Sequence, residues 1–191
     1  MFENLRADLD RAIADRPGTF AKGFLKRHRS LQKIRILLAL NTWGVISHRF
    51  SASVRKVRTP VVRQLLMAVA VIFQRWVMLW TGIYIDRQAE IGPGLVVHTP
   101  YAVFIGRVTV GANCTVGTGV IINGSVGNNV YFGPGSKVLG EGSVGNNVVV
   151  VANSVVLFEI QDNLTVMGIP ARGGWPGGRA SHFPKSASSP N

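Results

Sequence analysis

Histidine is the side chain that most often exchanges protons near neutral pH, and this 191-residue chain contains His28, His48, His98 and His182. An imidazole can act as a general base that removes the proton of a hydroxyl group. His28 lies in a basic run, His48 in a predicted helix and His182 near the C-terminus. His98 directly follows an inward-facing aliphatic residue of a repeat, at a position where side chains turn outward. We therefore expect His98 to be the base, the alternative being an exposed or structural histidine at a corner of the fold.

Cys114 is the single cysteine of the chain, so no intramolecular disulfide is expected. This cysteine usage is typical of a reducing compartment and favours a cytoplasmic location. Cys114 occupies a small inward position of the repeat, so we expect it in the core rather than acting as a nucleophile. The sequence shows no cluster of metal ligands, and no metal is expected.

Three helices are predicted in the first 82 residues, which form a small helical domain. Apolar residues recur at helical spacing over 2–13, and Arg-Pro-Gly at 16–18 ends that helix. A second helix is expected from a capping Ser30 to about Phe50. Thr59 and Pro60 predict a third helix, with a capping hydroxyl and a proline whose missing N–H costs nothing in the first turn. It continues to about Trp80.

From about residue 83 the helical period gives way to a period of six, interrupted by two slips. A large inward side chain is expected at Ile85, Ile91, Val97, Phe104, Val110, Val116, Ile122, Val126, Phe132, Val138, Val144, Val150 and Val156. A small or branched residue stands four places later at Ala89, Leu95, Cys114, Val120, Val130, Ser136, Val148 and Ser154. Glycine often directly follows the large residue.

This pattern is typical of a parallel β-helix, in which three short strands joined by sharp corners make one coil. Glycine and asparagine tolerate the backbone conformation of the corners. We expect four to five coils over residues 83–172, with a helical domain at 1–82 and a flexible tail at 173–191. The alternative, an ordinary all-β domain with glycine-rich turns, does not explain thirteen positions in phase.

The net charge of +12 is concentrated near the N-terminus, because residues 1–75 hold 15 Lys and Arg against 4 Asp and Glu. Three interpretations compete: a solvated helical surface, attraction to an anionic membrane or to phosphates, and a nucleic-acid site. No nucleic-acid motif accompanies the charge, so no nucleic-acid partner is expected.

The apolar stretch 61–80 raises the question of a membrane span. Arg63, Gln64, Gln74 and Arg75 interrupt it, and the unbroken run 65–73 is too short to cross a bilayer. A buried or interface helix is expected, with weak association at the inner face of a membrane as the alternative. The charged opening of the chain predicts no secretory signal peptide.

Three stretches, together with the helical N-terminus, resemble the serine acetyltransferase family and related exopolysaccharide-type acetyltransferases. The segment 5–9 (LRADL) resembles the start of the family's helical domain, and 91–98 (IGPGLVVH) its active-site coil. Residues 129–140 (NVYFGPGSKVLG) resemble its later coils, and 168–172 (GIPAR) its closing motif. The resemblance covers most of residues 1–172.

The resemblance implies a left-handed β-helix that assembles as a homotrimer or a dimer of trimers. It also implies acetyl-CoA as the acyl donor, bound in clefts between neighbouring prisms. The matching positions for cofactor binding are Gly133, Pro134 and Ala152, whose backbone would line the pantetheine groove. Arg172 would pair with CoA phosphates, the alternative being a solvated terminal arginine.

The chain departs from the family pattern at two places. Serine enzymes carry an acidic residue followed by a histidine, whereas His98 and Thr99 fill those two positions here. Thr99 is accordingly expected to contact the acceptor. The family's longer loop with a second histidine is replaced by the tight connection 122–126. Three functions therefore stay open: O-acetylation of L-serine, O-acetylation of a sugar for polysaccharide assembly, and a non-catalytic trimeric scaffold.

Overall fold

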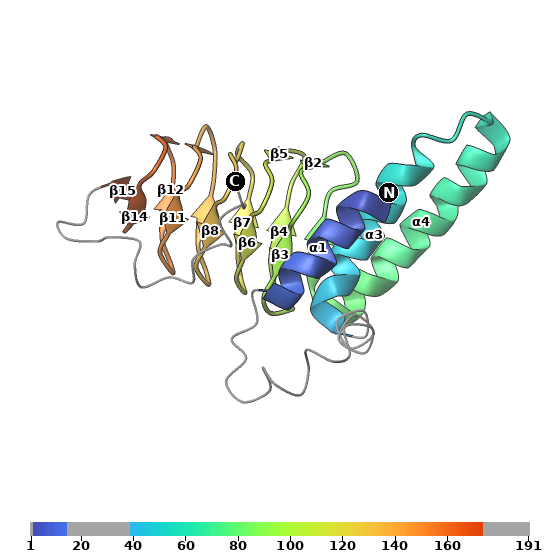
Figure 1. Cartoon of the computed structure of the whole chain (residues 1–191), viewed down its shortest axis with the longest axis horizontal. Helices are drawn as coiled ribbons and strands as arrows, with labels where there is room; N and C mark the ends of the chain where they lie inside the picture. Colours follow the sequence, from blue (N-terminus) through green and yellow to red (C-terminus); the bar gives the residue numbers. More distant parts are fainter. Residues whose placement is uncertain (1, 15–38, 174–191) are drawn as a thin grey trace.

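The computed structural model describes residues 2–14 and 39–173, in which three helices precede a stack of short strands (Figure 1). The helices are α1 (Phe2–Ala14), α3 (Leu40–Val54) and α4 (Pro60–Thr81). The predictions for His28, Ser30, His182 and residues 174–191 fall outside the described residues. The strands begin at Ile83.

The ends of α4 follow largely from its sequence. Pro60 occupies the first turn, and Gly82 ends the helix with φ of 63°, its N–H donating to the Met78 carbonyl. The Thr59 side chain makes no capping hydrogen bond, so the predicted hydroxyl cap was wrong. The second helix was expected from Ser30 to about Phe50. In the described residues α3 begins at Leu40, because Ala39 has extended backbone, and it ends at Val54.

The strands form three faces of a prism, named here A, B and C. Face A contains β1 (Ile83–Ile85), β4 (Val103–Ile105), β7 (Ile121–Ile122), β9 (Lys137–Val138) and β12 (Val155–Val156). Face B contains β2 (Glu90–Ile91), β5 (Thr109–Val110), β10 (Ser143–Val144) and β13 (Glu159–Ile160), bridged in the middle by Val126. Face C contains β3 (Val96–Val97), β6 (Thr115–Val116), β8 (Tyr131–Phe132), β11 (Val149–Val150), β14 (Thr165–Met167) and β15 (Arg172–Gly173).

The fold is the expected left-handed β-helix, with five coils marked by the five strands of face A. The strands of neighbouring coils are parallel; only β15 pairs antiparallel, with β14. The expected inward side chains are buried except Phe104, which is 39% exposed. Ile105 points inward instead, in register with Ile85. The corner at residues 98–102 is two residues longer than the period of six requires. The sequence predicted a slip of one residue here, so the place of the slip was correct and its length was wrong.

The small inward residues behave as predicted. Ala89, Leu95, Cys114 and Val120 are buried in the upper coils. The same holds in the lower coils for Val130, Ser136, Val148 and Ser154. Ile160 and Val166 continue the core into the fifth coil, beyond the predicted last position at Val156.

Asparagine fixes the edge between faces B and C. Below Gly94 of the first coil, the residues with left-handed backbone on this edge are Asn113, Asn129, Asn147 and Asn163, with φ between 56° and 63°. Their neighbours add a ladder of side-chain bonds, in which Asn128 Oδ1 accepts from the Ala112 N–H and Asn146 Oδ1 from the Asn128 N–H. The ladder fixes the vertical register of the coils at this edge.

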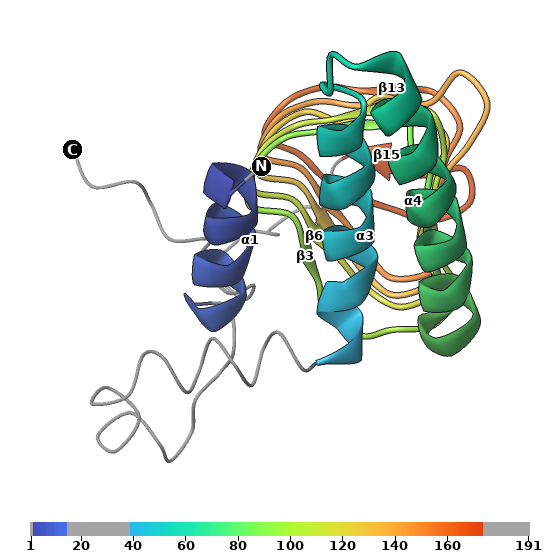
Figure 2. The same cartoon turned by 90° about the vertical axis from the view of Figure 1, so that its right-hand side faces the viewer.

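The helices close the open end of the first coil, as Figure 2 shows from that end. A first coil has carbonyl groups with no coil above them, and buried carbonyls need donors. Polar side chains of α3 and α4 supply these donors. Asn41 donates to the Val97 carbonyl, Arg49 to those of Ile91 and Gly92, and Gln74 to that of Ile85. His48 completes the set at the Ala89 carbonyl.

Candidate active site

His98 lies at the end of β3, on the edge where the chain passes from face C to face A. Its side chain is exposed, and its backbone N–H donates to the Val116 carbonyl in the coil below, at 2.9 Å. The Asn41 amide of α3 donates to the carbonyls of Val97, at 2.7 Å, and His98, at 3.3 Å. The imidazole thus extends into solvent from a backbone that is held both from above and from below.

The four residues after His98 form a corner with unusual backbone conformation. Tyr101 and Ala102 have φ of 87° and 54°, a region that side chains other than glycine rarely adopt. The Tyr101 N–H donates to the Thr81 carbonyl at the end of α4, at 2.7 Å. Its carbonyl accepts from the Gly119 N–H of the second coil, at 3.3 Å. These bonds hold the corner in a defined position between the helices and the second coil.

The structure brings Gly133, Pro134 and Ala152 to the same edge as His98. The register of face C aligns Val97, Val116, Phe132 and Val150. The residues that follow these positions therefore form one row, here called the His98 edge: residues 98–102, 117–119, 133–135, 151–153 and 168–171. Coils stack about 4.8 Å apart, so Gly133 lies roughly 10 Å and Ala152 roughly 14 Å below His98.

The three residues predicted to line the donor groove differ in what they present. Pro134 and Ala152 are exposed on the edge, whereas Gly133 is buried. A Cβ atom at Gly133 would lie 2.5 Å from the backbone nitrogen of Ala152, so the stacking of coils already requires glycine there. A side chain at this position would separate the third coil from the fourth.

Thr99 and Arg172 stand at opposite ends of this edge. Thr99 is exposed beside His98 in the first coil. Arg172, also exposed, lies in β15 in register with Met167, the residue that precedes the last corner of the edge. The arrangement places a basic side chain at the far end of a row of small residues that begins at an imidazole.

Sequence reasoning missed the groups that hold the corner, namely Asn41 and the Thr81 carbonyl. Asn41 stands in the first turn of α3 and carries no motif, and a backbone carbonyl has no signature in a sequence. Only the packing of α3 and α4 across the first coil identifies them. The signal that could have suggested Asn41 is the run of polar residues and glycine in α3, where eight of the fifteen residues are Asn, Thr, Ser, His, Arg or Gly.

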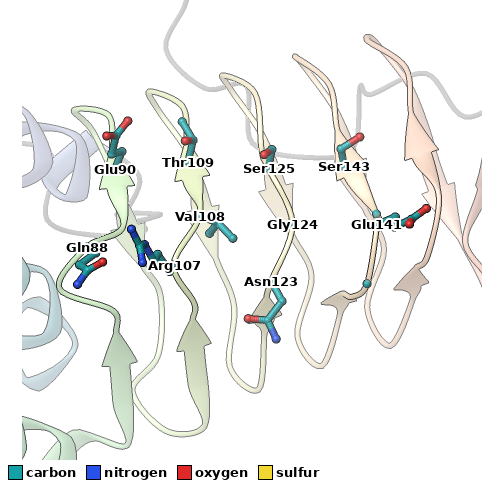
Figure 3. A pocket seen from close by; sticks show the side chains of 12 residues that line it. Gln88, Glu90, Arg107, Val108, Thr109, Asn123, Gly124, Ser125, Glu141 and Ser143 are labelled. Atoms are coloured by element: carbon teal, nitrogen blue, oxygen red, sulfur yellow. The ribbon is translucent and has the colours of Figure 1, made fainter.

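A polar hollow of about 540 Å³ lies on another edge, between faces A and B (Figure 3). Figure 3 shows Glu90, Thr109, Ser125 and Ser143 following one another across successive coils. Its other charged and amide side chains are Gln88, Arg107, Asn123 and Glu141. The short connection at 122–126 forms part of this hollow. Neither this hollow nor its continuation along face B reaches His98 within one chain.

The two other candidate groups are unsuited to catalysis. Burial raises the pKa of the Cys114 thiol, so the thiol stays protonated in the core, as expected from its inward position. His48 is 3% exposed and bonded to the Ala89 carbonyl, so it cannot meet a substrate. Within residues 2–14 and 39–173, no group of three His, Cys, Asp or Glu side chains is placed to hold a metal ion.

Known proteins resemble this chain over most of its length, although no protein-family model matches it. The serine acetyltransferase of Synechococcus elongatus is 31% identical over 184 residues, covering 90% of this chain and 68% of the relative. That of Staphylococcus aureus strain Mu50 is 38% identical over 102 residues, or 48% of each chain. The chain thus spans about half the length of the staphylococcal relative.

Solved structures share the fold. The serine acetyltransferase of Brucella abortus superposes with a TM-score of 0.73 at 23% identity, covering 90% of this chain and 68% of that chain. The soybean enzyme complexed with serine gives 0.72 at 22% identity, with the same two coverages of 90% and 68%. On the strength of the cyanobacterial relative, aligned along nine-tenths of its sequence, this protein belongs to the serine acetyltransferase family.

Proposed function

We propose that the protein transfers the acetyl group of acetyl-CoA to a hydroxyl, with His98 as the general base. The observation that carries this proposal is the His98 edge, where one exposed imidazole stands at the end of a row of small residues and bare backbone. Membership of the serine acetyltransferase family supports acetyl transfer as the reaction. A solved serine acetyltransferase in complex with CoA, of the same fold, supports acetyl-CoA as the donor.

In the proposed reaction, the His98 imidazole accepts the proton of the acceptor hydroxyl as its oxygen attacks the thioester carbonyl. The C–S bond breaks when the tetrahedral intermediate collapses. The imidazolium then returns its proton to the departing thiolate, so His98 ends the cycle neutral. The Thr99 hydroxyl, next in the chain, is proposed to bind the acceptor.

The donor is proposed to lie along the His98 edge below the imidazole. Pro134 and Ala152 leave the edge narrow and free of long side chains, which suits an extended pantetheine arm. Arg172 lies at the far end, and its guanidinium can donate two parallel hydrogen bonds to a phosphate group. Arg172 lies on β15, five strands below β3 on face C, so roughly 24 Å separates the reacting end from the phosphate end.

A homotrimer is proposed to complete the cleft, because His98 lines neither of the two hollows described above. Face A, which borders this edge, carries apolar side chains on its outer surface. Tyr84 and Phe104 stack there with ring centres 5.1 Å apart. Ile121 and Val155 continue the strip below them, with Lys137 in register between the two. Packing this strip against a neighbouring prism would place a wall beside His98.

The test is release of free thiol from acetyl-CoA by the purified full chain, with L-serine, with a panel of sugars and without acceptor. His98→Ala is expected to lower acceptor-dependent release by about a hundredfold or more, the effect of losing a general base. Gln64→Ala, an exposed position on α4 away from the His98 edge and from both hollows, is the matched control and keeps its activity. Unchanged turnover in His98→Ala would remove His98 from the proposed mechanism.

L-Serine is the first acceptor to test, since solved relatives of the same fold are complexes with serine. A sugar hydroxyl is the second candidate, and the polar hollow favours it. Its hydroxyl, carboxylate and amide groups repeat along successive coils, a lining that suits a polyhydroxylated molecule. Turnover with sugars alone would select the second candidate. Absence of turnover with every acceptor, and of acetyl-CoA binding by calorimetry, would select the scaffold instead.

A further inference from the structure

Helix α4 exposes a continuous apolar stripe that no described part of the chain covers. Successive residues of a helix are 100° apart, so the stripe falls within an arc of about 120°. Its members are Val61, Val62, Leu65, Val69, Ile72, Trp76, Leu79 and Trp80. The most exposed are Leu79, at 84%, and Val61, at 76%. Contiguous apolar surface of this size marks an interaction site in soluble proteins.

The opposite side of α4 is already occupied. Ala70, Gln74, Val77 and Thr81 are buried there against α3 and the first coil. Gln74 donates to the Ile85 carbonyl, which fixes the rotation of the helix about its own axis. The stripe therefore faces away from the prism, at the outer boundary of the helical layer (Figure 2).

The charged residues beside the stripe indicate what kind of surface it binds. The α3–α4 connection carries Arg55, Lys56 and Arg58, all exposed, and Arg75 lies on the flank of the stripe. No Asp or Glu occurs between residues 16 and 85, a segment with 13 Lys and Arg. A second copy of the chain would bring a surface of the same positive charge against this one. An anionic lipid surface offers the complementary charge.

The length and aromatic content of α4 fit a bilayer interface. The helix has 22 residues, and its most apolar 18-residue stretch has a mean hydropathy of 1.5, with 17% of that stretch buried. Trp76 and Trp80, whose rings lie 5.9 Å apart, stand at one end of the stripe, and tryptophan prefers the depth of lipid headgroups. Because the other side of α4 is fixed to α3, the helix would lie in the plane of the membrane rather than cross it.

We propose that α4 docks the protein on the surface of an anionic membrane, with the apolar stripe inserted among the lipids and Arg55, Lys56 and Arg58 at the headgroups. Burial of the apolar side chains and attraction of the basic residues to the anionic headgroups then act together. This docking is independent of the acetyl transfer proposed above, because none of its residues lies on the His98 edge.

The experiment is sedimentation of the full chain with vesicles of phosphatidylcholine alone or mixed with anionic phosphatidylglycerol. Binding is expected to be at least about tenfold tighter to the anionic vesicles and to weaken in high salt. The triple variant Leu65→Ser, Ile72→Ser, Leu79→Ser is expected to lose binding by about tenfold or more. Because all three side chains are exposed, its Tm stays near that of the unmodified chain.

The matched control is the double variant Phe158→Ser, Ile169→Ser, which removes exposed apolar side chains from the β-helix, at 65% and 73% exposure. It is expected to bind vesicles like the unmodified chain. A separate readout places α4 itself in the lipid. Lipids brominated on their acyl chains should quench the fluorescence of the full chain, and Trp76→Phe, Trp80→Phe should remove most of that quenching while still sedimenting with vesicles.

Three outcomes would overturn the proposal. The chain could fail to sediment with either kind of vesicle. It could bind neutral and anionic vesicles equally and resist extraction by alkaline carbonate, which would indicate a spanning helix. Finally, the triple variant could lower the molar mass measured by light scattering without any vesicle binding by the unmodified chain, in which case a second copy covers the stripe.

Discussion

Asp8 and Arg49 form an ion pair that is almost completely removed from water. Their side chains are 3% and 6% exposed, with Arg49 Nε 3.0 Å from Asp8 Oδ2. Asp8 Oδ1 also accepts from the N–H groups of Gly94 and Leu95. Arg49 donates in addition to the Ile91 and Gly92 carbonyls. Each charge is thus compensated by the other and by backbone dipoles, which a buried pair requires.

Replacing Asp8 by Ala should therefore cost about 3–5 kcal/mol of unfolding free energy, because it leaves the Arg49 guanidinium buried without its counter-charge. Urea unfolding at neutral pH measures this cost. Asp10→Ala is the matched control on the same helix, since Asp10 faces Arg6 at 3.8 Å on the surface. Its cost should stay within about 0.5 kcal/mol. Equal costs for the two variants would show that the pair does not anchor α1.

Burial also controls the protonation of His48. Desolvation, strengthened by the neighbouring charges of Arg49 and Arg55, lowers the pKa of His48 to about 4 from the ordinary 6.5. The Ala89 carbonyl can only accept a hydrogen bond, so the neutral ring donates to it from Nε2. The native protein therefore keeps His48 neutral between pH 4 and pH 6.5, whereas the unfolded chain protonates it.

Stability consequently falls as pH decreases through this window, because the unfolded state takes up the proton. From pH 7 to pH 5 the loss attributable to His48 should be about 2 kcal/mol. His48→Gln retains an N–H donor for the Ala89 carbonyl but does not titrate. Between pH 7 and pH 5, the unfolding free energy of His48→Gln should therefore fall by about 2 kcal/mol less than that of the unmodified chain. Parallel curves for the chain and the variant would contradict the lowered pKa of His48.

At the scale of elements, α3 covers the open end of the prism, and Gly44 determines how closely α3 packs against the first coil. A Cβ atom at Gly44 would lie 2.5 Å from Ile83 Cγ2. Ile83 is 2% exposed and stiff at its branched Cβ, so it cannot turn aside. The close approach permits the donors of α3 to reach the carbonyls of the first coil.

Gly44→Ala sets two effects against each other. Helix propensity alone would stabilise α3 by about 1 kcal/mol. The collision with Ile83 should outweigh this gain and give a net loss of about 1–3 kcal/mol. Thermal or urea unfolding measures the result. The control is the same substitution in an Ile83→Ala background, which lacks Cγ2 and should therefore lose much less unfolding free energy. If Gly44→Ala raised the unfolding free energy of the unmodified chain, α3 would not be in tight contact with the first coil.

The elements differ in how far their sequence determines them. Pro60 and Gly82 bound α4 because both act locally, one through its ring and the other through its left-handed backbone. The face of β4 was mispredicted at Phe104, since the length of the corner before it depends on bonds to Thr81 and Gly119 from distant segments. The period of six in the sequence predicts that a coil forms, but it does not predict how many residues each corner of that coil contains.

At the scale of the whole molecule, the same distinction applies to the site. Strict stacking of coils carries Gly133, Pro134 and Ala152 to the edge of His98, so their neighbourhood followed from the period of six. The support from Asn41 did not, because it depends on how α3 crosses the first coil. The apolar stripe of α4 could be predicted only in part. Its apolar composition follows from the sequence, but whether it lies in the core or on the surface depends on which side of α4 packs against α3.

The stacked architecture makes a final prediction about which edge receives the donor. Ala152 is exposed on the His98 edge, and a bulky side chain there would obstruct the row without entering the core. Ala152→Trp should therefore raise KM for acetyl-CoA by about tenfold or more while Tm stays nearly unchanged. Gln161→Trp is the matched control, since Gln161 is exposed on the edge between faces B and C. Steady-state kinetics at saturating acceptor would measure both. If Gln161→Trp raised KM more than Ala152→Trp did, acetyl-CoA would bind at the edge between faces B and C. The row of residues below His98 would then not be the donor site.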